Sequence, residues 1–316
     1  MLKTQTLWND QQWVAGFAPR PEDYEQLAKQ YQIPARFIKR IRDKKGRARF
    51  DYDFESQCSL FIFKVVAARS GAGQEKARTT PLIVLVSGNT IITLVQNNQE
   101  AVQKQVAAVT NDGLPNMVAH PSLIMLGMYL LFDFNERYFD YINDLDNLRQ
   151  KLEKYKNSPS NDQIVRLSEL SKSFVYLRAA VSGNLVAVRQ LQAFADDGDA
   201  QPLLSKKEDY WLRNLQTELE QARDLAQVNG EIVQQVTDAY ANLLDKNLNT
   251  TMWVMTIWSL ALAIPPIISG FYGMNVKLPI IGGWFDWPFT ILLSLVPAVV
   301  LILGLRRRRN LTGKDA

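Results

Sequence analysis

The sequence contains few of the residues that build metal and disulfide sites. Its 316 residues include one cysteine, Cys58, and one histidine, His120. A single cysteine excludes a disulfide within the chain and fits a reducing compartment. With one residue of each kind, we do not expect a zinc site of the usual histidine and cysteine ligands within one chain.

The motifs of common enzyme classes are missing as well. The sequence has no HExxH pattern and no glycine-rich phosphate loop, and Gly71-Ala72-Gly73 lies in a stretch that indicates an exposed loop. Neither Cys58 nor His120 has a catalytic context. A membrane-tethered enzyme therefore finds little support, and we expect no catalytic residue and no cofactor.

Charged residues are absent from two long stretches near the C-terminus. Met252–Phe271 covers 20 residues and Trp287–Leu305 covers 19, and neither stretch contains Asp, Glu, Lys or Arg. About 20 apolar residues are needed to cross the hydrocarbon core of a bilayer, so both are predicted membrane spans. Because the spans contain no ionisable acid or base, a proton relay or a fixed ion pair inside the membrane is unsupported.

The rest of the chain has a composition typical of soluble proteins. Hydrophobic residues make up 47% and charged residues 22% of the sequence. The net charge is +4, and Arg306–Arg309 alone supply that many positive charges. The basic pI is thus a property of the tail and does not indicate nucleic-acid binding.

The same arginine run predicts the orientation of the spans. Positive residues beside a span stay in the cytosol, so the C-terminal tail is expected there. The N-terminus lacks the apolar core of a secretory signal, and two spans return the chain to its starting side. Both termini of this multi-pass protein of the cell membrane are therefore predicted to be cytosolic, with Tyr272–Asp286 outside.

The first third of the sequence predicts an α/β domain. A proline followed by acidic residues at Pro21 starts one helix, and a second follows Pro34. Gly88-Asn89 separates two β-branched runs and predicts a tight hairpin turn. The expected strands are Gln12–Ala18, Arg49–Phe54, Cys58–Ala68, Leu82–Ser87 and Thr90–Val95.

Long helices follow. Leu123–Leu152 and Ile164–Phe194 predict an antiparallel pair, broken by a turn at Asn157–Ser160. The next turn, Ala195–Pro202, contains three aspartates, and an exposed surface is a simpler interpretation than a cation site.

A third helix is expected to continue from Lys206 into the first span, because no proline lies between Lys206 and Thr250. Its apolar residues recur with a period close to 3.5 residues, which suits helix–helix packing. A stalk built by several subunits is favoured over a bundle within one subunit. The predicted row is Leu212, Leu215, Leu219, Ala222, Leu225, Val228, Ile232, Val236, Tyr240 and Leu243.

One face of the first span consists of small and polar residues. Small residues allow close helix packing, but such a face also suits a water-filled path enclosed by several copies of the chain. Pro265-Pro266 is expected to loosen the helix and to free backbone carbonyls. The residues on this face are Asn249, Met252, Thr256, Ser259, Ala263, Pro266 and Gly270.

Tyr272-Gly273-Met274-Asn275, at the end of the first of two C-terminal spans and before a short loop and a basic tail, resembles the CorA family of divalent-cation channels. The resemblance implies an α/β N-terminal cytosolic domain, long stalk helices and a two-helix transmembrane domain, assembled as a homopentameric funnel. It also implies uptake of Mg²⁺, often with Co²⁺ or Ni²⁺, as substrate and as a possible regulatory ligand. The implied domains are residues 1–118 (α/β), 119–203 (antiparallel helices), 204–251 (stalk), 252–271 (first span), 272–287 (outer loop), 288–305 (second span) and 306–316 (tail).

The resemblance also implies roles for residues. Gly273, Met274 and Asn275 would form the outer mouth, where Asn275 holds a hydrated ion. Asn249 matches a polar ring near the cytosolic end, and Met252 and Met255 match an apolar gate that closes by dewetting. The other pore-facing steps are Thr256, Ser259, Ala263, Pro266 and Gly270.

The sequence departs from the family pattern at two places. The outer loop has one acidic residue, Asp286, where relatives often have more. The stalk has Asn214 where relatives often have an aspartate of an intersubunit Mg²⁺ sensor. Closure by cytosolic Mg²⁺ is therefore expected to be weaker, or to depend on the other carboxylates Glu208, Asp209 or Asp238.

Two alternatives stay open. A ZntB-like zinc transporter is related, although Met274 favours the Mg²⁺ branch because the zinc branch tends to vary this methionine. A membrane-anchored coiled-coil scaffold belongs to another class, but it needs neither a polar face on the first span nor a Gly-Met-Asn exit. Selectivity among Mg²⁺, Co²⁺, Ni²⁺ and Zn²⁺, and channel against proton-coupled transport, are not decided by the sequence.

Overall fold

The structure is a computed structural model of the chain. It describes residues 2–43, 46–66, 79–95, 104, 121–153, 160–196, 204–274 and 286–312. The chain divides into two compact units, Met1–Ala239 and Tyr240–Ala316.

The first unit contains a six-stranded sheet with the order β1-β2-β6-β5-β4-β3. Neighbouring strands are antiparallel except for the parallel pair β2 and β6. The predicted hairpin turn is confirmed, because Ser87 pairs with Thr90 and Gly88 has a φ of 53°. The strands are β1 (Leu2–Thr6), β2 (Gln12–Phe17), β3 (Arg49–Asp53), β4 (Cys58–Val66), β5 (Thr79–Ser87) and β6 (Thr90–Val95).

Two short helices, α1 (Pro21–Gln30) and α2 (Ala35–Ile41), cover one face of the sheet. The α1 helix begins at Pro21, as predicted, and Asp23 accepts a hydrogen bond from the backbone N–H of Arg20 at 2.7 Å. Phe37 and Ile41 from α2 are fully buried against alternate residues of the strands. Cys58 belongs to this core, and burial raises the pKa of its thiol to about 12, which makes the thiol unreactive.

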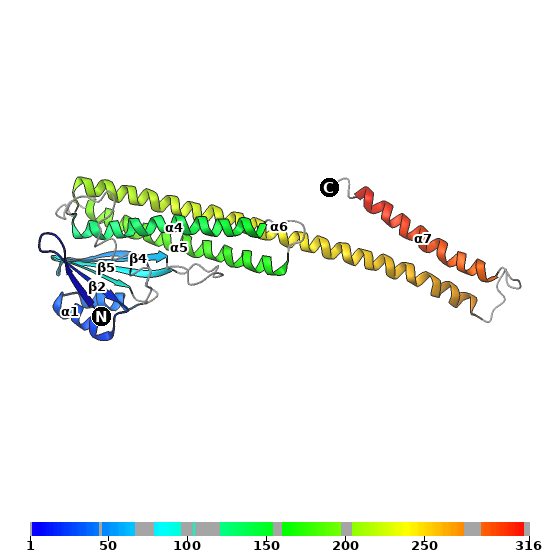
Figure 1. Cartoon of the computed structure of the whole chain (residues 1–316), viewed down its shortest axis with the longest axis horizontal. Helices are drawn as coiled ribbons and strands as arrows, with labels where there is room; N and C mark the ends of the chain where they lie inside the picture. The colour runs from blue at the N-terminus through cyan, green and yellow to red at the C-terminus, as the bar shows by residue number, and fades with distance from the viewer. Residues whose placement is uncertain are drawn as a thin grey trace. The chain divides into compact units, whose positions relative to one another are not determined.

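The long helices α4 (Leu123–Glu153), α5 (Asn161–Asp196) and α6 (Lys206–Tyr272) follow the sheet (Figure 1). A Cβ added at Gly127 would lie 3.2 Å from a methyl of Val84, so α4 approaches β5 closely. The Trp211 ring makes edge contacts with Tyr129 and Phe132, which packs the start of α6 on α4. The expected antiparallel pair and the continuous third helix are both present.

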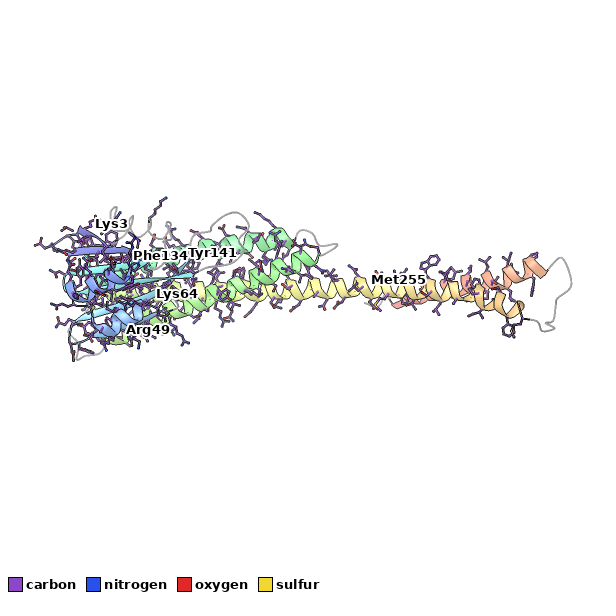
Figure 2. The ribbon with its side chains drawn as sticks, turned by 90° about the horizontal axis from the view of Figure 1, so that it is seen from below. Lys3, Arg49, Lys64, Phe134, Tyr141 and Met255 are labelled. Carbon is purple, nitrogen blue, oxygen red and sulfur yellow. The ribbon has the colours of Figure 1, made fainter. Side chains whose placement is uncertain are left out.

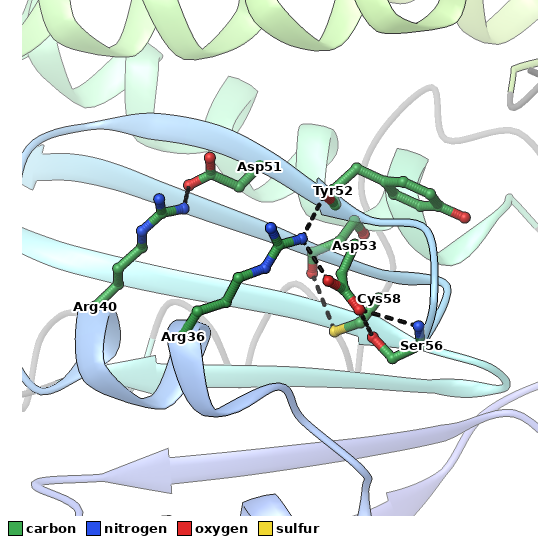
Figure 3. Close-up of polar contacts among 8 residues, drawn as sticks. Arg36, Arg40, Asp51, Tyr52, Asp53, Ser56 and Cys58 are labelled. Atoms are coloured by element: carbon green, nitrogen blue, oxygen red, sulfur yellow. Dashed lines mark hydrogen bonds and ion pairs between the residues drawn. The ribbon is translucent and has the colours of Figure 1, made fainter.

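Side chains block the outer edge of β3 (Figure 3). The backbone N–H of Phe50 donates to Oε1 of Gln190 at 2.9 Å, and Arg36 donates to the carbonyl of Tyr52 at 3.0 Å. Arg36 also forms an ion pair with Asp53. These contacts occupy groups that would otherwise pair with a foreign strand.

Asn184 pairs with β4 beyond the first residue of β3. Arg49, the first residue of β3, pairs with Ile62 of β4. Lys64 lies two residues farther along β4 and has no partner in β3. The Lys64 N–H donates to Oδ1 of Asn184 at 2.8 Å, and Nδ2 of Asn184 donates to the Lys64 carbonyl at 2.7 Å. The Tyr138 hydroxyl donates to the same carbonyl at 2.6 Å. Lys64 is labelled in Figure 2. One side-chain amide thus replaces a strand residue and ties β4 to α5.

The buried row of α6 differs from the predicted one after Ala222. Leu212, Leu215, Leu219 and Ala222 are buried as expected, and Tyr240 is buried as well. Between them, however, the buried positions are Ala226, Asn229 and Val233. The remaining predicted members are half-buried or exposed, and the first three of them lie one residue before a buried position. They are Leu225, Val228, Ile232, Val236 and Leu243.

Candidate functional site

The C-terminal part of α6 carries the candidate site. Among the described residues, α6 is the helix long and apolar enough to cross a membrane, judged by length and composition. A shorter apolar segment, Ile291–Gly304, lies in α7 (Asp286–Thr312), which runs back beside this part of α6 (Figure 1). The arginine run that was predicted as a tail belongs to α7, which continues to Thr312.

The small and polar face of the span is exposed along its whole length in the chain. Ile257 and Ala261 of α6 are buried instead, and so are Ser294 and Ala298 of α7. Because a helix turns by about 100° per residue, the exposed face lies about 140° around α6 from the covered row. The exposed residues are Asn249, Met252, Thr256, Ser259, Ala263, Pro266 and Gly270.

This arrangement shows that the small residues do not serve packing against the chain's own second apolar helix. If they served the packing of the two spans within one chain, they would lie against α7. The covered row of α6 consists of other residues, with Ile257 and Ala261 at its centre and the half-buried Ile264 next to them. The small and polar face is therefore left for a neighbouring copy or for water.

The span offers oxygen atoms on more than one of its faces. The Thr256 hydroxyl donates to the Met252 carbonyl at 2.8 Å, so its oxygen keeps lone pairs directed outward. Pro265 and Pro266 lie inside α6 and have no N–H, so the carbonyls of Ala261 and Leu262 lose their usual partners in the helix. The helix nevertheless continues through both prolines to Tyr272.

The predicted mouth begins where α6 ends. The Gly273 N–H donates to the Ser269 carbonyl at 2.9 Å, and the Met274 N–H donates to the Phe271 carbonyl at 3.4 Å. A Cβ on Gly273 would lie 3.2 Å from the Ser269 oxygen, so the turn is tight. Met274 is exposed, whereas Asn275 lies outside the described residues.

Met252 and Met255, the predicted gate, are exposed by 68% and 66%. The side chain of Met255 extends away from the helix (Figure 2). Neither methionine contributes to a core within the chain. Packing inside one chain therefore does not explain them.

Glu208, a predicted regulatory ligand, caps two helices. Oε2 accepts the backbone N–H of Ser205 at 2.7 Å and Oε1 accepts that of Ser122 at 3.1 Å. The Ser205 hydroxyl in turn accepts the Glu208 N–H, which completes a capping box at the start of α6. Burial raises the pKa of this carboxyl, but the hydrogen bonds from Ser122 and Ser205 outweigh it and lower the pKa overall.

Of the other two regulatory candidates, Asp209 is half-buried and Asp238 is exposed. Asp209 forms an ion pair with Arg213 at 3.0 Å, one turn along the helix. Asp238 accepts a hydrogen bond from the neutral amide of Gln234 at 3.0 Å. In the part of the chain that the structure describes, no three carboxylate, histidine or cysteine side chains are grouped to hold a metal ion.

A row of acidic residues on α6 was not recognised in the sequence. Asp224, Glu231, Asp238 and Asp245 follow each other at steps of seven, and all four are exposed. The next step of seven is Met252, the first residue of the predicted gate. The seven-residue spacing is the signal that the sequence carries for this row.

Comparison with known proteins identifies the family. The family model described as "CorA-like Mg2+ transporter protein" matches residues 8–307. A curated relative, the cobalt/magnesium transport protein CorA of Methanocaldococcus jannaschii, is 20% identical over 303 residues, which cover 94% of this chain and 90% of the relative.

Solved structures agree on the fold. The complete CorA magnesium transporter of Methanocaldococcus jannaschii matches with a TM-score of 0.77 and 18% identity, covering 96% of this chain and 93% of the other. The full-length CmaX protein matches with a TM-score of 0.71 and 18% identity, covering 96% and 90%. The ZntB cytoplasmic domain of Vibrio parahaemolyticus matches with a TM-score of 0.56 and 13% identity, covering 75% and 88%. The α/β domain, the long helices and the match over nearly the whole chain show that this protein belongs to the CorA family of Mg²⁺ transporter proteins.

Proposed function

We propose that the protein is a homopentameric membrane channel that takes up divalent cations, with Mg²⁺ as the main substrate and Co²⁺ or Ni²⁺ as others. The observation that carries this proposal is the exposed small and polar face of α6, which packing within the chain leaves uncovered. One helix cannot enclose a pore, but the same face from several copies around an axis encloses one. The curated relative is named as a cobalt/magnesium transporter, which supports the choice of substrate.

The chemistry of the face suits a hydrated ion. Mg²⁺ gives up its water reluctantly, and neutral oxygen atoms bind the water shell without stripping it. Gly273, Met274 and Asn275 form the proposed mouth, in which the Asn275 amide ring holds the hydrated cation. Thr256 and Ser259 offer hydroxyl oxygens farther along the path, and Asn249 offers a second amide ring at the inner end.

The driving force is the membrane potential. Moving one elementary charge through 100 mV contributes about 2.3 kcal/mol, so a divalent cation gains about twice that amount. Met252 and Met255 form the proposed gate, because a ring of exposed thioether side chains closes a narrow pore by excluding water.

The proposed topology places both termini in the cytosol and the outer loop, residues 272–287, on the other side. The α/β domain and the stalk then lie on the cytosolic side, where a regulatory cation binds. Asp209 and Asp238 are proposed as its ligands across subunits. For Glu208 we propose that its main role is to cap helices and not to bind a cation, since both of its oxygens already accept hydrogen bonds.

Reconstitution in liposomes tests the proposal. A dye that reports internal Mg²⁺ should show uptake driven by an inside-negative potential, and Asn275→Ala should lower the initial rate at least tenfold. Asn242→Ala replaces an exposed asparagine elsewhere on α6 and should leave the rate unchanged. Zn²⁺ offered with a proton gradient tests the zinc alternative. Uptake that is absent in the parent, or unchanged in Asn275→Ala, would contradict the channel.

A further inference from the structure

The α5 helix has an exposed apolar row that its own chain does not cover. Val175 and Tyr176 are each 61% exposed and Val186 is 50% exposed, with the exposed Ala179 between them. These four residues, the α5 row, lie along one side of the helix at steps of three, four and seven. The opposite side of α5 is buried, with Phe174, Leu177 and Val181 at its centre.

The α6 helix has a second apolar row beside its buried one. The outer α6 row consists of Leu225, Val228, Ile232 and Val236, of which Val228 is 52% exposed and the others are half-buried. Its steps of three and four match a helix–helix seam. The intrachain contacts of α6 use the neighbouring positions Ala226, Asn229 and Val233 instead.

The two rows lie at the same height along the helices. A Cβ on Gly230 would lie 3.3 Å from Cβ of Phe174, and Arg189 forms an ion pair with Glu220 at 2.6 Å, so α5 and α6 run antiparallel side by side. Counting from Phe174 and Gly230 in opposite directions places Tyr176 level with Val228. It also places Ala179 level with Leu225.

The charges beside the rows are complementary. Lys172 and Arg178 are exposed next to the α5 row. Glu231 is exposed next to the outer α6 row, and by the same count it lies within one residue of the height of Lys172. A surface with an apolar centre and a basic edge thus has its counterpart, with an acidic edge, on the same unit.

We propose that the α5 row of one protomer packs on the outer α6 row of the next protomer. This inference rests on the proposed homo-oligomer. A closed ring needs two different patches on each subunit that fit one another, and the two rows meet this requirement. An axis that runs along the helices keeps every residue at its own height, so Tyr176 of one copy meets Val228 of the next. The contact would hold the α4–α5 hairpin of one protomer against the stalk of its neighbour.

Cysteine cross-linking of the full-length protein in detergent tests the contact. Cys58→Ser first removes the buried native thiol. In that background, oxidation of the double variant with Tyr176→Cys and Val228→Cys should give a ladder of covalent oligomers. Each single variant should stay monomeric on a denaturing gel. The pair Ala179→Cys and Leu225→Cys, one turn away, should give the same ladder and covers the event that the first pair does not fold.

A matched control keeps the cysteine at position 228 and places the second cysteine on α4. Asp140 is exposed on α4, so Asp140→Cys with Val228→Cys should give no ladder. If both test pairs give only monomers, or a disulfide within one chain, while size and Mg²⁺ uptake are unchanged, the contact is wrong and the channel stands. A ladder of equal strength in the Asp140 control also overturns the contact. Loss of uptake in the parent counts against the channel instead.

Discussion

A single amide, that of Asn184, satisfies two backbone groups of β4. Removing it leaves the Lys64 N–H unpaired in a buried setting, and an unsatisfied buried group costs about 1–3 kcal/mol. We expect Asn184→Leu to lower the free energy of unfolding by about 3 kcal/mol. Tyr138→Phe should cost only about 1 kcal/mol, since Asn184 still donates to the same carbonyl.

Urea unfolding of the detergent-solubilised protein, followed by tryptophan fluorescence, measures both effects. Asn143→Leu is the control, because Asn143 is exposed on α4 and should change the free energy of unfolding by less than about 0.5 kcal/mol. Equal losses for Asn184→Leu and Asn143→Leu would show that the amide does not stabilise the sheet edge.

Glu208 makes stability depend on pH. Its folded pKa lies below the ordinary value of a glutamate because the hydrogen bonds from Ser122 and Ser205 outweigh the effect of burial. A group with a depressed folded pKa contributes stability above its unfolded pKa and loses it as the pH falls through the folded value. The melting temperature of the parent should therefore fall towards that of Glu208→Gln as the pH drops from 6 to below 4.

The matched control for Glu208 is Glu136→Gln, which changes an exposed glutamate of α4. Its melting curve should stay parallel to that of the parent over the same pH range. A constant difference between parent and Glu208→Gln at every pH would mean that the carboxylate charge has no part in the two caps.

At the scale of elements, strands and helices with a regular pattern of apolar residues could be predicted. Elements with exposed polar side chains, and positions where a polar residue is buried, could not. The five expected strands and the continuous α6 follow from their own sequences. The strand β1 was missed because Leu2–Thr6 lies at the edge of the sheet with exposed side chains, so no alternation of polarity marks it. The α6 row was misread after Ala222 because the buried position there is the polar Asn229, whose amide donates to its own helix at 2.9 Å.

The candidate site shows the same division. The order of small residues on the span was visible in sequence, but which face the other span covers depends on contacts between separate helices. The amide bridge of Asn184 joins residues 120 apart in the chain, and the cap that Glu208 makes to Ser122 joins residues 86 apart. No local pattern reports such pairs.

The exposed face of α6 makes a prediction about transport. Thr256 and Thr251 both donate their hydroxyls to the carbonyl one turn before, at 2.8 and 3.0 Å, but only Thr256 lies on the small and polar face. Thr256→Leu adds apolar bulk to the proposed path and should lower Mg²⁺ uptake at least tenfold. Thr251→Leu makes the same change elsewhere and should alter uptake less than twofold. Equal effects would place the path on another face.

At the scale of the whole molecule, the control of the proposed pore by cytosolic Mg²⁺ depends on which carboxylates are available along the stalk. Glu208 is engaged in caps, Asp209 is paired with Arg213, and Asp224 is paired with Arg223 at 2.7 Å. Asp238 has a neutral partner, the Gln234 amide, so its charge is the least compensated of these four. We therefore expect Asp238 to contribute most to a regulatory site between subunits.

Flux at a series of internal Mg²⁺ concentrations measures this control. With Asn214 in place of an aspartate, millimolar internal Mg²⁺ should close the parent only in part, and Asn214→Asp should make closure more complete. Asp238→Asn should raise the Mg²⁺ concentration that closes half of the channels at least threefold. Asp224→Asn changes the same type of residue two heptads away on the same row and should leave this concentration unchanged. Full closure of the parent would show that Asn214 does not weaken the response. Equal shifts in the two aspartate variants would mean that the row acts through its total charge and not through Asp238.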